Sequence, residues 1–146
     1  MDLIRLKEEL LKIGANIGLQ VEEENQNNIT LHATLVAKDY YQDSIYLRIT
    51  VFSSGTFHMF LTFNTIETTY DNLFLINHFN AENPWFKAYV ANLNNKDFLE
   101  LHFVALSLKE VEDALDTFGF LMNELLSEET TKLLNTIVTY SHHLFH

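Results

Sequence analysis

Three histidines are the residues best placed for chemistry in this sequence: His32, His58 and His102. Each falls in a segment whose apolar side chains alternate, as in a β-strand, and each lies opposite the apolar set, as does Glu100. If the strands are neighbours, the imidazoles and the carboxylate would meet, and such a cluster could bind a metal ion or transfer protons. The alternative is that surface strands simply carry single histidines. We therefore assign no metal, and these three histidines stay weak candidate ligands.

The remaining chemical groups have structural explanations. Four acidic side chains between residues 110 and 116 lie off the apolar stripe of a predicted helix, and a catalytic carboxylate pair would need burial to raise a pKa. Three histidines between residues 142 and 146 lie in a terminal tail. The chain has no cysteine, no phosphate-binding glycine loop and no hydrolase motif. We expect no catalytic residue, no cofactor and no enzymatic activity.

The charge of the chain limits the partners that it can bind. Nine basic and twenty acidic residues give a formal charge of −11, which repels phosphate backbones and anionic lipid surfaces. No stretch of 18 apolar residues exists, and the N-terminal segment is a charged amphipathic run rather than a signal peptide. The sequence therefore predicts a cytoplasmic protein without a nucleic-acid or membrane partner.

The elements that would position these residues follow from apolar periodicity across a single domain of residues 1–146. The pattern predicts a helix over 2–14, strands within 18–64, a helix over 68–80, strands within 85–105 and a helical region over 107–144. The order is one helix, three or four strands, one helix, two strands, and one or two helices. This order predicts an α+β fold, a single antiparallel sheet of five to six strands with helices packed on it.

Two details of the helices can also be predicted. Leu73, Ile76 and Phe79 lie at helical spacing and should form the buried stripe of the helix over 68–80. Ser107 is followed three residues later by Glu110, a pattern typical of a capping box, and should begin the next helix.

The segment LINHFNAENPWFKAYV (Leu75–Val90), which connects the middle helix to the strand that follows, contains several residues typical of a helix end and a strand start. Asn80 or Asn83 can end the helix in a left-handed conformation, and Pro84 suits the entry to a strand. The asparagines at every third position, followed by an aromatic strand with a basic residue, resemble the YbjN family. The resemblance implies the fold of type III secretion chaperones, which are commonly dimers, and a non-enzymatic protein that is chaperone-like or regulatory. It implies no catalytic residues.

The face of the sheet opposite the core carries large aromatic side chains and a few charges, a composition typical of a binding surface. The candidate partner-binding residues are Tyr46, Arg48, Phe52, His58, Phe60, Trp85, Lys87 and Tyr89. The alternative is that a helix covers this face, either the first helix or the segment after Ser127. If the face is open, the expected partner is another protein or a second copy in a homodimer.

Three functions fit these observations. The leading hypothesis is a non-enzymatic protein-interaction module, acting through the aromatic sheet face or a homodimer interface. A second is an acidic protein of the immunity or antitoxin type that neutralises a basic partner, as the charge of −11 suggests. A third is a protein that binds a small ligand or a metal through its strand histidines.

Overall fold

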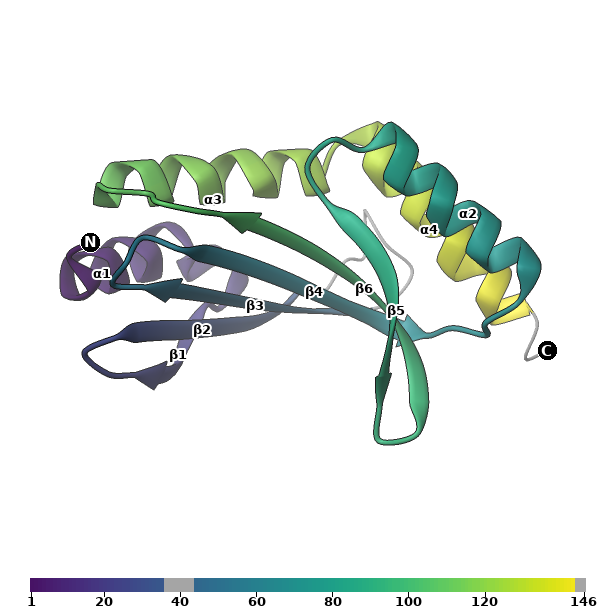
Figure 1. The fold of residues 1–146 in the computed structure, drawn as a ribbon, viewed down its shortest axis with the longest axis horizontal. Helices are drawn as coiled ribbons and strands as arrows, with labels where there is room; N and C mark the ends of the chain where they lie inside the picture. Colours follow the sequence, from purple (N-terminus) through teal and green to yellow (C-terminus); the bar gives the residue numbers. More distant parts are fainter. Residues whose placement is uncertain (36–43, 144–146) are drawn as a thin grey trace.

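The computed structural model describes residues 1–35 and 44–143, and it contains one antiparallel sheet with helices packed on it (Figure 1). The six strands lie in the order β1-β2-β3-β4-β6-β5, and every neighbouring pair is antiparallel. Their bounds are β1 (Gln20–Glu24), β2 (Asn28–Leu35), β3 (Ile45–Phe52), β4 (Phe57–Thr65), β5 (Lys87–Leu93) and β6 (Lys96–Ala105). The predicted α+β class and strand number are confirmed.

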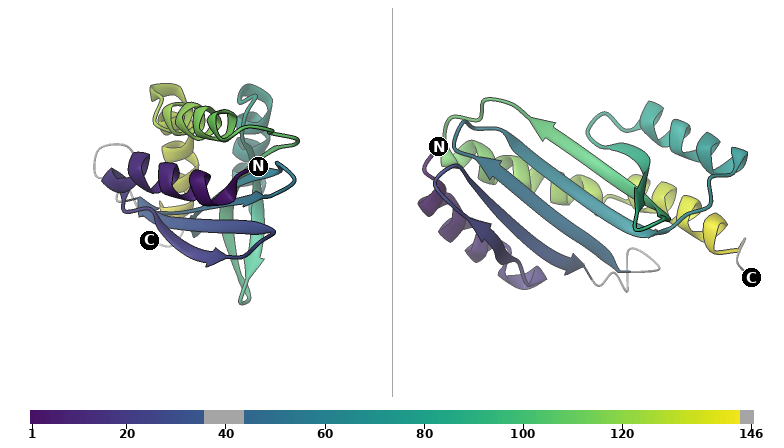
Figure 2. Two further views of the ribbon diagram at one scale, coloured as in Figure 1. Left: turned by 90° about the vertical axis from the view of Figure 1, so that its left-hand side faces the viewer. Right: turned by 60° about the horizontal axis from the view of Figure 1, so that its bottom comes forward.

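Four α-helices, and a short 3-10 turn over Ala15–Ile17, accompany the sheet in the described ranges. The helices are α1 (Leu3–Ile13), α2 (Tyr70–Glu82), α3 (Val111–Leu125) and α4 (Glu128–His143). They lie on one side of the sheet, and the view from below in Figure 2 shows the strands in front of α3 and α4. Neither α1 nor the described part of α4 covers the opposite face. The C-terminal region is therefore two helices, and both pack on the core side.

Alternation along the strands explains why the core lies on one side. In β3 every second side chain from Ile45 to Val51 is fully buried, whereas the side chains between them are not. Leu6 and Leu10 of α1 are buried in the same core, as is Phe118 of α3. Burying one such aliphatic or aromatic side chain contributes roughly 1.5–3 kcal/mol to folding. This burial fixes the register, because a slip by one residue would turn the apolar set toward water.

The start of α3 differs from the prediction. Ser107 has a φ of +60° and does not cap the helix, which begins at Val111. The capping box is formed instead by Glu110 and Asp113. The Glu110 side chain accepts the backbone N–H of Asp113, and the Asp113 side chain accepts the backbone N–H of Glu110. The physical reason is a long-range tether, in which the Leu108 N–H donates to the Gly55 carbonyl at 2.9 Å. This bond holds the chain before α3 against the β3–β4 turn.

The buried stripe of α2 also differs from the prediction. Ile76 and Phe79 are buried as expected, but Leu73 is 40% exposed. Asn72 occupies the buried position instead, and its side-chain amide donates to the Glu67 carbonyl at 2.9 Å. Because that bond ties the first turn of α2 to the preceding loop, the helix is rotated away from the predicted stripe.

The asparagines of the α2–β5 junction hold the strand to the helix. Asn83 caps α2 in an extended conformation, with φ −97° and ψ 114°, so the predicted left-handed ending is wrong. Its side-chain oxygen accepts the N–H groups of Trp85 at 2.9 Å and Phe86 at 2.8 Å. Asn80 does not end the helix; its amide exchanges hydrogen bonds of 2.6 and 2.9 Å with the backbone of Ala88. These bonds satisfy the outward backbone groups at the start of edge strand β5.

Replacing Asn83 tests this junction. Asn83→Ala should lower the free energy of unfolding by about 2–3 kcal/mol, because the N–H groups of Trp85 and Phe86 lose their buried acceptor. Asn77→Ala is the matched control, since Asn77 lies in the same motif and helix but is exposed, and it should change stability by less than about 0.5 kcal/mol. Urea denaturation measures both. Equal effects of the two substitutions would contradict the proposed role of Asn83.

Candidate functional site

The sheet surface that points away from the helices is the candidate site, and we call it the open face. It is formed by alternate residues of the four inner strands β2, β3, β4 and β6. Its members are Thr30, His32, Thr34, Tyr46, Arg48, Thr50, Phe52, His58, Phe60, Thr62, Phe98, Glu100, His102 and Val104. Tyr89 of β5 and Glu22 of β1 border it on either side.

A row of paired residues crosses this face from strand to strand. The register places His32 opposite Arg48, Arg48 opposite Phe60, and Phe60 opposite His102. In an antiparallel sheet such partners present their side chains on the same face, close enough to touch. The order of residues along this row therefore determines which side chains are neighbours, and it separates His32 from His102.

An aromatic–histidine cluster, made of Phe52, His58, Phe60 and His102, extends over β3, β4 and β6 from the middle of the open face toward the β3–β4 turn. The ring of Phe60 lies parallel to that of His102, with centroids 4.2 Å apart and planes inclined by 5°. Phe52 meets His58 edge-on, with centroids 5.9 Å apart and an interplanar angle of 72°. Three of the four rings are nearly parallel, because His58 and Phe60 are inclined by only 2°. Such contacts are favourable beyond the area that they bury.

The two histidines of this cluster are hydrogen-bonded to each other. His58 Nδ1 lies 3.0 Å from His102 Nε2, the ring centroids are 5.3 Å apart and the planes are inclined by 6°. Because the two nitrogens are much closer to each other than the two ring centroids are, both nitrogens must lie close to the line that joins the centroids. The rings therefore meet edge to edge. One nitrogen donates and the other accepts. Burial, followed by the charge of His58, lowers the pKa of His102, and Glu100 partly offsets this.

The predicted grouping of His32 with His58 and His102 does not form. Arg48 and Phe60 stand between His32 and His102 in the row, and three strand spacings correspond to roughly 14 Å. The ring of His32 contacts Tyr46 instead, at 5.9 Å. Among the residues that the structure describes, no group of three or more His, Cys, Asp or Glu side chains could hold a metal ion.

Glu100 is engaged elsewhere on the sheet. It accepts the hydroxyl proton of Tyr89 at 2.6 Å and that of Thr62 at 3.4 Å. Burial, followed by these contacts with Glu100, raises the pKa of Tyr89 far above its ordinary value, so the phenol stays protonated. The other border of the face is also tied down, because Arg48 pairs with Glu22 at 3.3 Å.

Six of the eight candidate partner-binding residues lie on the open face or at its border, namely Tyr46, Arg48, Phe52, His58, Phe60 and Tyr89. The placement of Trp85 was wrong, because it precedes β5 and packs edge-on against Phe120 of α3, 4.7 Å away. The placement of Lys87 was wrong in part. Its strand position faces His102, but its ammonium donates to the Asn80 and Asn83 carbonyls at 3.2 and 3.5 Å. Because β5 is an edge strand, this long side chain reaches the negative end of α2.

Among the exposed apolar groups that were not predicted from the sequence, two bear on the candidate site. Val104 is 41% exposed beside the cluster, where it lies opposite His58. On α2, Tyr70 is 83% exposed, Phe74 is 61% exposed and Leu73 lies between them, which makes a second, smaller apolar stripe. The spacing i, i+3, i+4 of these three residues was the available signal, and it was hidden because α2 is apolar on both sides.

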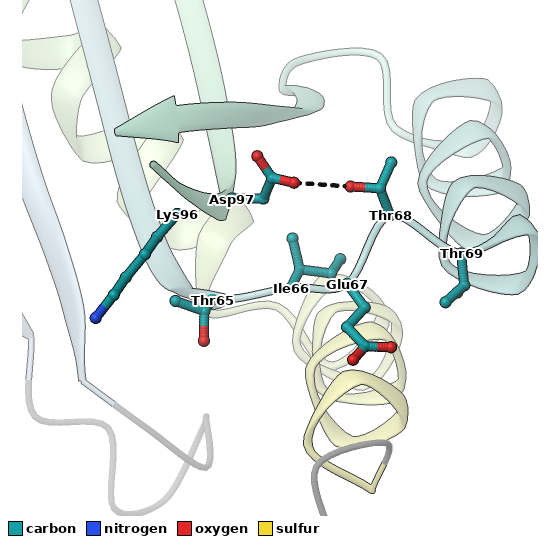
Figure 3. Close-up of a pocket in the computed structure, with 7 residues that line it drawn as sticks. All are labelled: Thr65, Ile66, Glu67, Thr68, Thr69, Lys96 and Asp97. Atoms are coloured by element: carbon teal, nitrogen blue, oxygen red, sulfur yellow. Dashed lines mark hydrogen bonds between the residues drawn. The ribbon is translucent and has the colours of Figure 1, made fainter. Parts of the chain in front are cut away.

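A shallow depression of about 530 Å³ lies where β4 leads into α2 (Figure 3). It is lined by Thr65, Ile66, Glu67, Thr68, Thr69, Lys96 and Asp97. The Asp97 carboxylate accepts from Thr68 at 2.9 Å and from Asn92 at 2.9 Å, and these bonds lower its pKa. Its carboxylate oxygens are thus used to join the β5–β6 turn to the loop before α2, which is a structural role.

The acidic side chains at the start of α3 also have structural partners. Glu110 and Asp113 form the capping box, and Glu112 pairs with Arg5 of α1. The side chains of the terminal histidines, His142, His143 and His146, lie outside the described residues.

Comparisons of the chain with protein-family models, with curated proteins and with solved structures found no match. No helix in residues 1–35 and 44–143 has both the length and the apolar character needed to cross a membrane.

The histidine pair should make stability depend on pH. The pKa of His102 is lowered in the folded protein, so the unfolded chain binds its proton first, at the ordinary histidine pKa of about 6.5. The free energy of unfolding should therefore fall as the pH drops from 7.5 to about 5, where carboxylates are still largely ionised. Urea denaturation at several pH values measures this fall.

Substitution at position 102 identifies the group responsible. His102→Gln keeps a polar atom at the position of Nε2 but cannot titrate, so its stability should fall less steeply over the same range. His78→Gln, at an exposed histidine of α2, is the control. An unchanged slope in His102→Gln would show that the pair does not govern this dependence.

Proposed function

We propose that this chain is a non-enzymatic protein-interaction module, of the chaperone-like or regulatory kind, whose open face binds a second copy of the chain. The observation that carries the proposal is the aromatic–histidine cluster, which lies on a sheet face that no described helix covers. Sheets commonly pack face to face, so a second sheet is a suitable cover. The resemblance of residues 75–90 to the YbjN family points the same way.

The size of the open face suits a dimer. Four strands of at least eight residues, spaced about 4.8 Å apart with about 3.3 Å per residue, cover roughly 500 Å². Two copies would bury about 1,000 Å², the lower limit for a specific interface. Phe60 would lie near its centre, with Tyr46 and Phe52 toward the two ends of β3, and aromatic residues are those most enriched in such interfaces.

Charge makes the open face the surface at which two copies of the chain would repel each other least. The whole chain carries −11, so two copies repel each other over most of their surfaces. The open face carries one guanidinium, Arg48, and one carboxylate, Glu100, so its formal charge is zero. Like-charge repulsion is therefore smallest where two open faces meet. A two-fold axis would let each copy present the same patch to the other.

The exposed apolar stripe of α2 is the alternative surface through which two copies could associate. Tyr70, Leu73 and Phe74 lie on one helix, so they cover a narrower area than four strands. The stripe thus provides a control, because Phe74 is an exposed aromatic residue outside the open face.

Sedimentation velocity of matched variants separates the two surfaces. The unmodified protein should form a dimer, and Phe60→Arg should be a monomer, since it adds a second cation beside Arg48 in a desolvated interface. Tyr46→Arg, at a more exposed position of the same face, should weaken the dimer at least tenfold. Phe74→Arg should remain dimeric. A protein that is monomeric at every concentration, or a dimer lost only in Phe74→Arg, would contradict the proposal.

The salt dependence separates a second copy from a basic partner. Because the repelling charges of two copies are screened by salt, dimerisation should strengthen between 50 and 500 mM NaCl. Binding of a basic protein, as in the immunity or antitoxin hypothesis, would weaken over the same range. An association that weakens with salt would therefore favour that alternative.

A further inference from the structure

The histidine pair at the centre of the open face is built around one hydrogen-bonding proton. His58 Nδ1 and His102 Nε2 face each other at 3.0 Å, and each ring has a second nitrogen on its far side. In the neutral pair, one inner nitrogen carries a proton and the other accepts it. The pair thus has two stable neutral arrangements, and both keep the rings edge to edge.

We propose that the His58–His102 pair is a proton-controlled switch: the second proton that it binds breaks the hydrogen bond, drives the rings apart and weakens self-association through the open face. The effect on association rests on the proposed function, whereas the separation of the rings does not.

Counting protons shows why the second one is decisive. The first added proton occupies an outer nitrogen and gives an imidazolium–imidazole pair, which keeps one N–H between the inner nitrogens. The second gives two imidazolium rings, in which both inner nitrogens carry hydrogen. Two donors then face each other at hydrogen-bonding distance, and two positive charges lie side by side. Titration of such a pair occurs in two separated steps that belong to the pair.

The charged and titratable groups around the pair do not neutralise this repulsion. Glu100 on β6 is the nearest carboxylate along the strand, but it accepts hydrogen bonds from Tyr89 on β5 and Thr62 on β4. Arg48 on β3 lies on the other side of Phe60 and adds positive charge. Lys87 on β5 is the strand partner of His102, although its ammonium reaches α2. Burial, followed by the charge of His58, lowers the pKa of His102, in the sense that the switch requires, and the charge of Glu100 offsets this only in part.

The phenylalanines transmit the change to the surface. Phe60 stacks on His102 and also lies beside His58, and Phe52 meets His58 edge-on, so movement of either histidine changes the ring contacts of at least one phenylalanine. In a face-to-face dimer, both copies would gain positive charge on a surface whose formal charge is otherwise zero. Acidification should therefore dissociate the dimer, within a range where the carboxylates are still mostly ionised.

The first experiment observes the pair directly. Nitrogen-15 NMR of the imidazole rings, recorded from pH 8 to pH 5, should show two separated protonation steps for His58 and His102. The second step should be accompanied by loss of ring-current shifts at Phe52 and Phe60. His32→Gln, elsewhere on the open face, should leave both steps in place. Two independent single-step titrations without ring movement would overturn the proposal, whatever the oligomeric state.

The second experiment links the pair to association. Sedimentation velocity should show the dissociation constant of the dimer rising at least tenfold between pH 7.5 and pH 5.5. The double variant His58→Asn, His102→Gln keeps polar atoms at the positions of Nδ1 and Nε2 but cannot titrate, so its dimer should lose most of this dependence. A dimer whose pH dependence is the same in both proteins would overturn the switch. A monomer at every pH would overturn the proposed function instead, and the NMR titration would still decide whether the pair switches.

Discussion

Along the inner strands of the sheet, apolar side chains alternate with the open-face residues and most of them are buried beneath the helices, and this one-sided burial is the constraint on which the rest depends. Because α1, α3 and the described part of α4 all lie on the core side, the side chains between the apolar set must find neighbours among themselves. On the open face these neighbours form a ring stack, an N–H···N bond between two histidines and a Tyr–Glu hydrogen bond. Its composition is therefore a consequence of the fold as well as a candidate for recognition.

Short polar connections maintain this arrangement at both ends of the sheet. At one end the Asn80 and Asn83 amides fasten β5 to the last turn of α2. At the other end Leu108 is bonded to Gly55, whose φ of +97° suits glycine and whose hydrogen leaves room that a Cβ would not. Both junctions restrict the position of a helix relative to the sheet, α2 at one end and α3 at the other. They hold the end of α2 to β5 and the chain before α3 to the β3–β4 turn.

Much of the fold could be predicted from the sequence, because period-2 alternation specifies strands and which side chains share a face. Strand order could not, and the candidate site depends on it. Insertion of β6 between β4 and β5 places His102 beside Phe60 and leaves His32 three strands away. A long-range bond accounts for the start of α3, since the tether from Leu108 to Gly55 holds the preceding chain and the capping box begins at Glu110 rather than at Ser107. Lys87 was misplaced because alternation does not show which strand is an edge.

The central claim is that two open faces meet in a dimer, and isotope-filtered NMR of a mixed dimer tests it most directly. In a sample of one labelled and one unlabelled copy, the account predicts intermolecular contacts from the ring protons of Phe60 and Tyr46 to open-face protons of the other copy. Intermolecular contacts confined to Tyr70 and Phe74 of α2, or none from the open face in a sample shown to be dimeric, would contradict it.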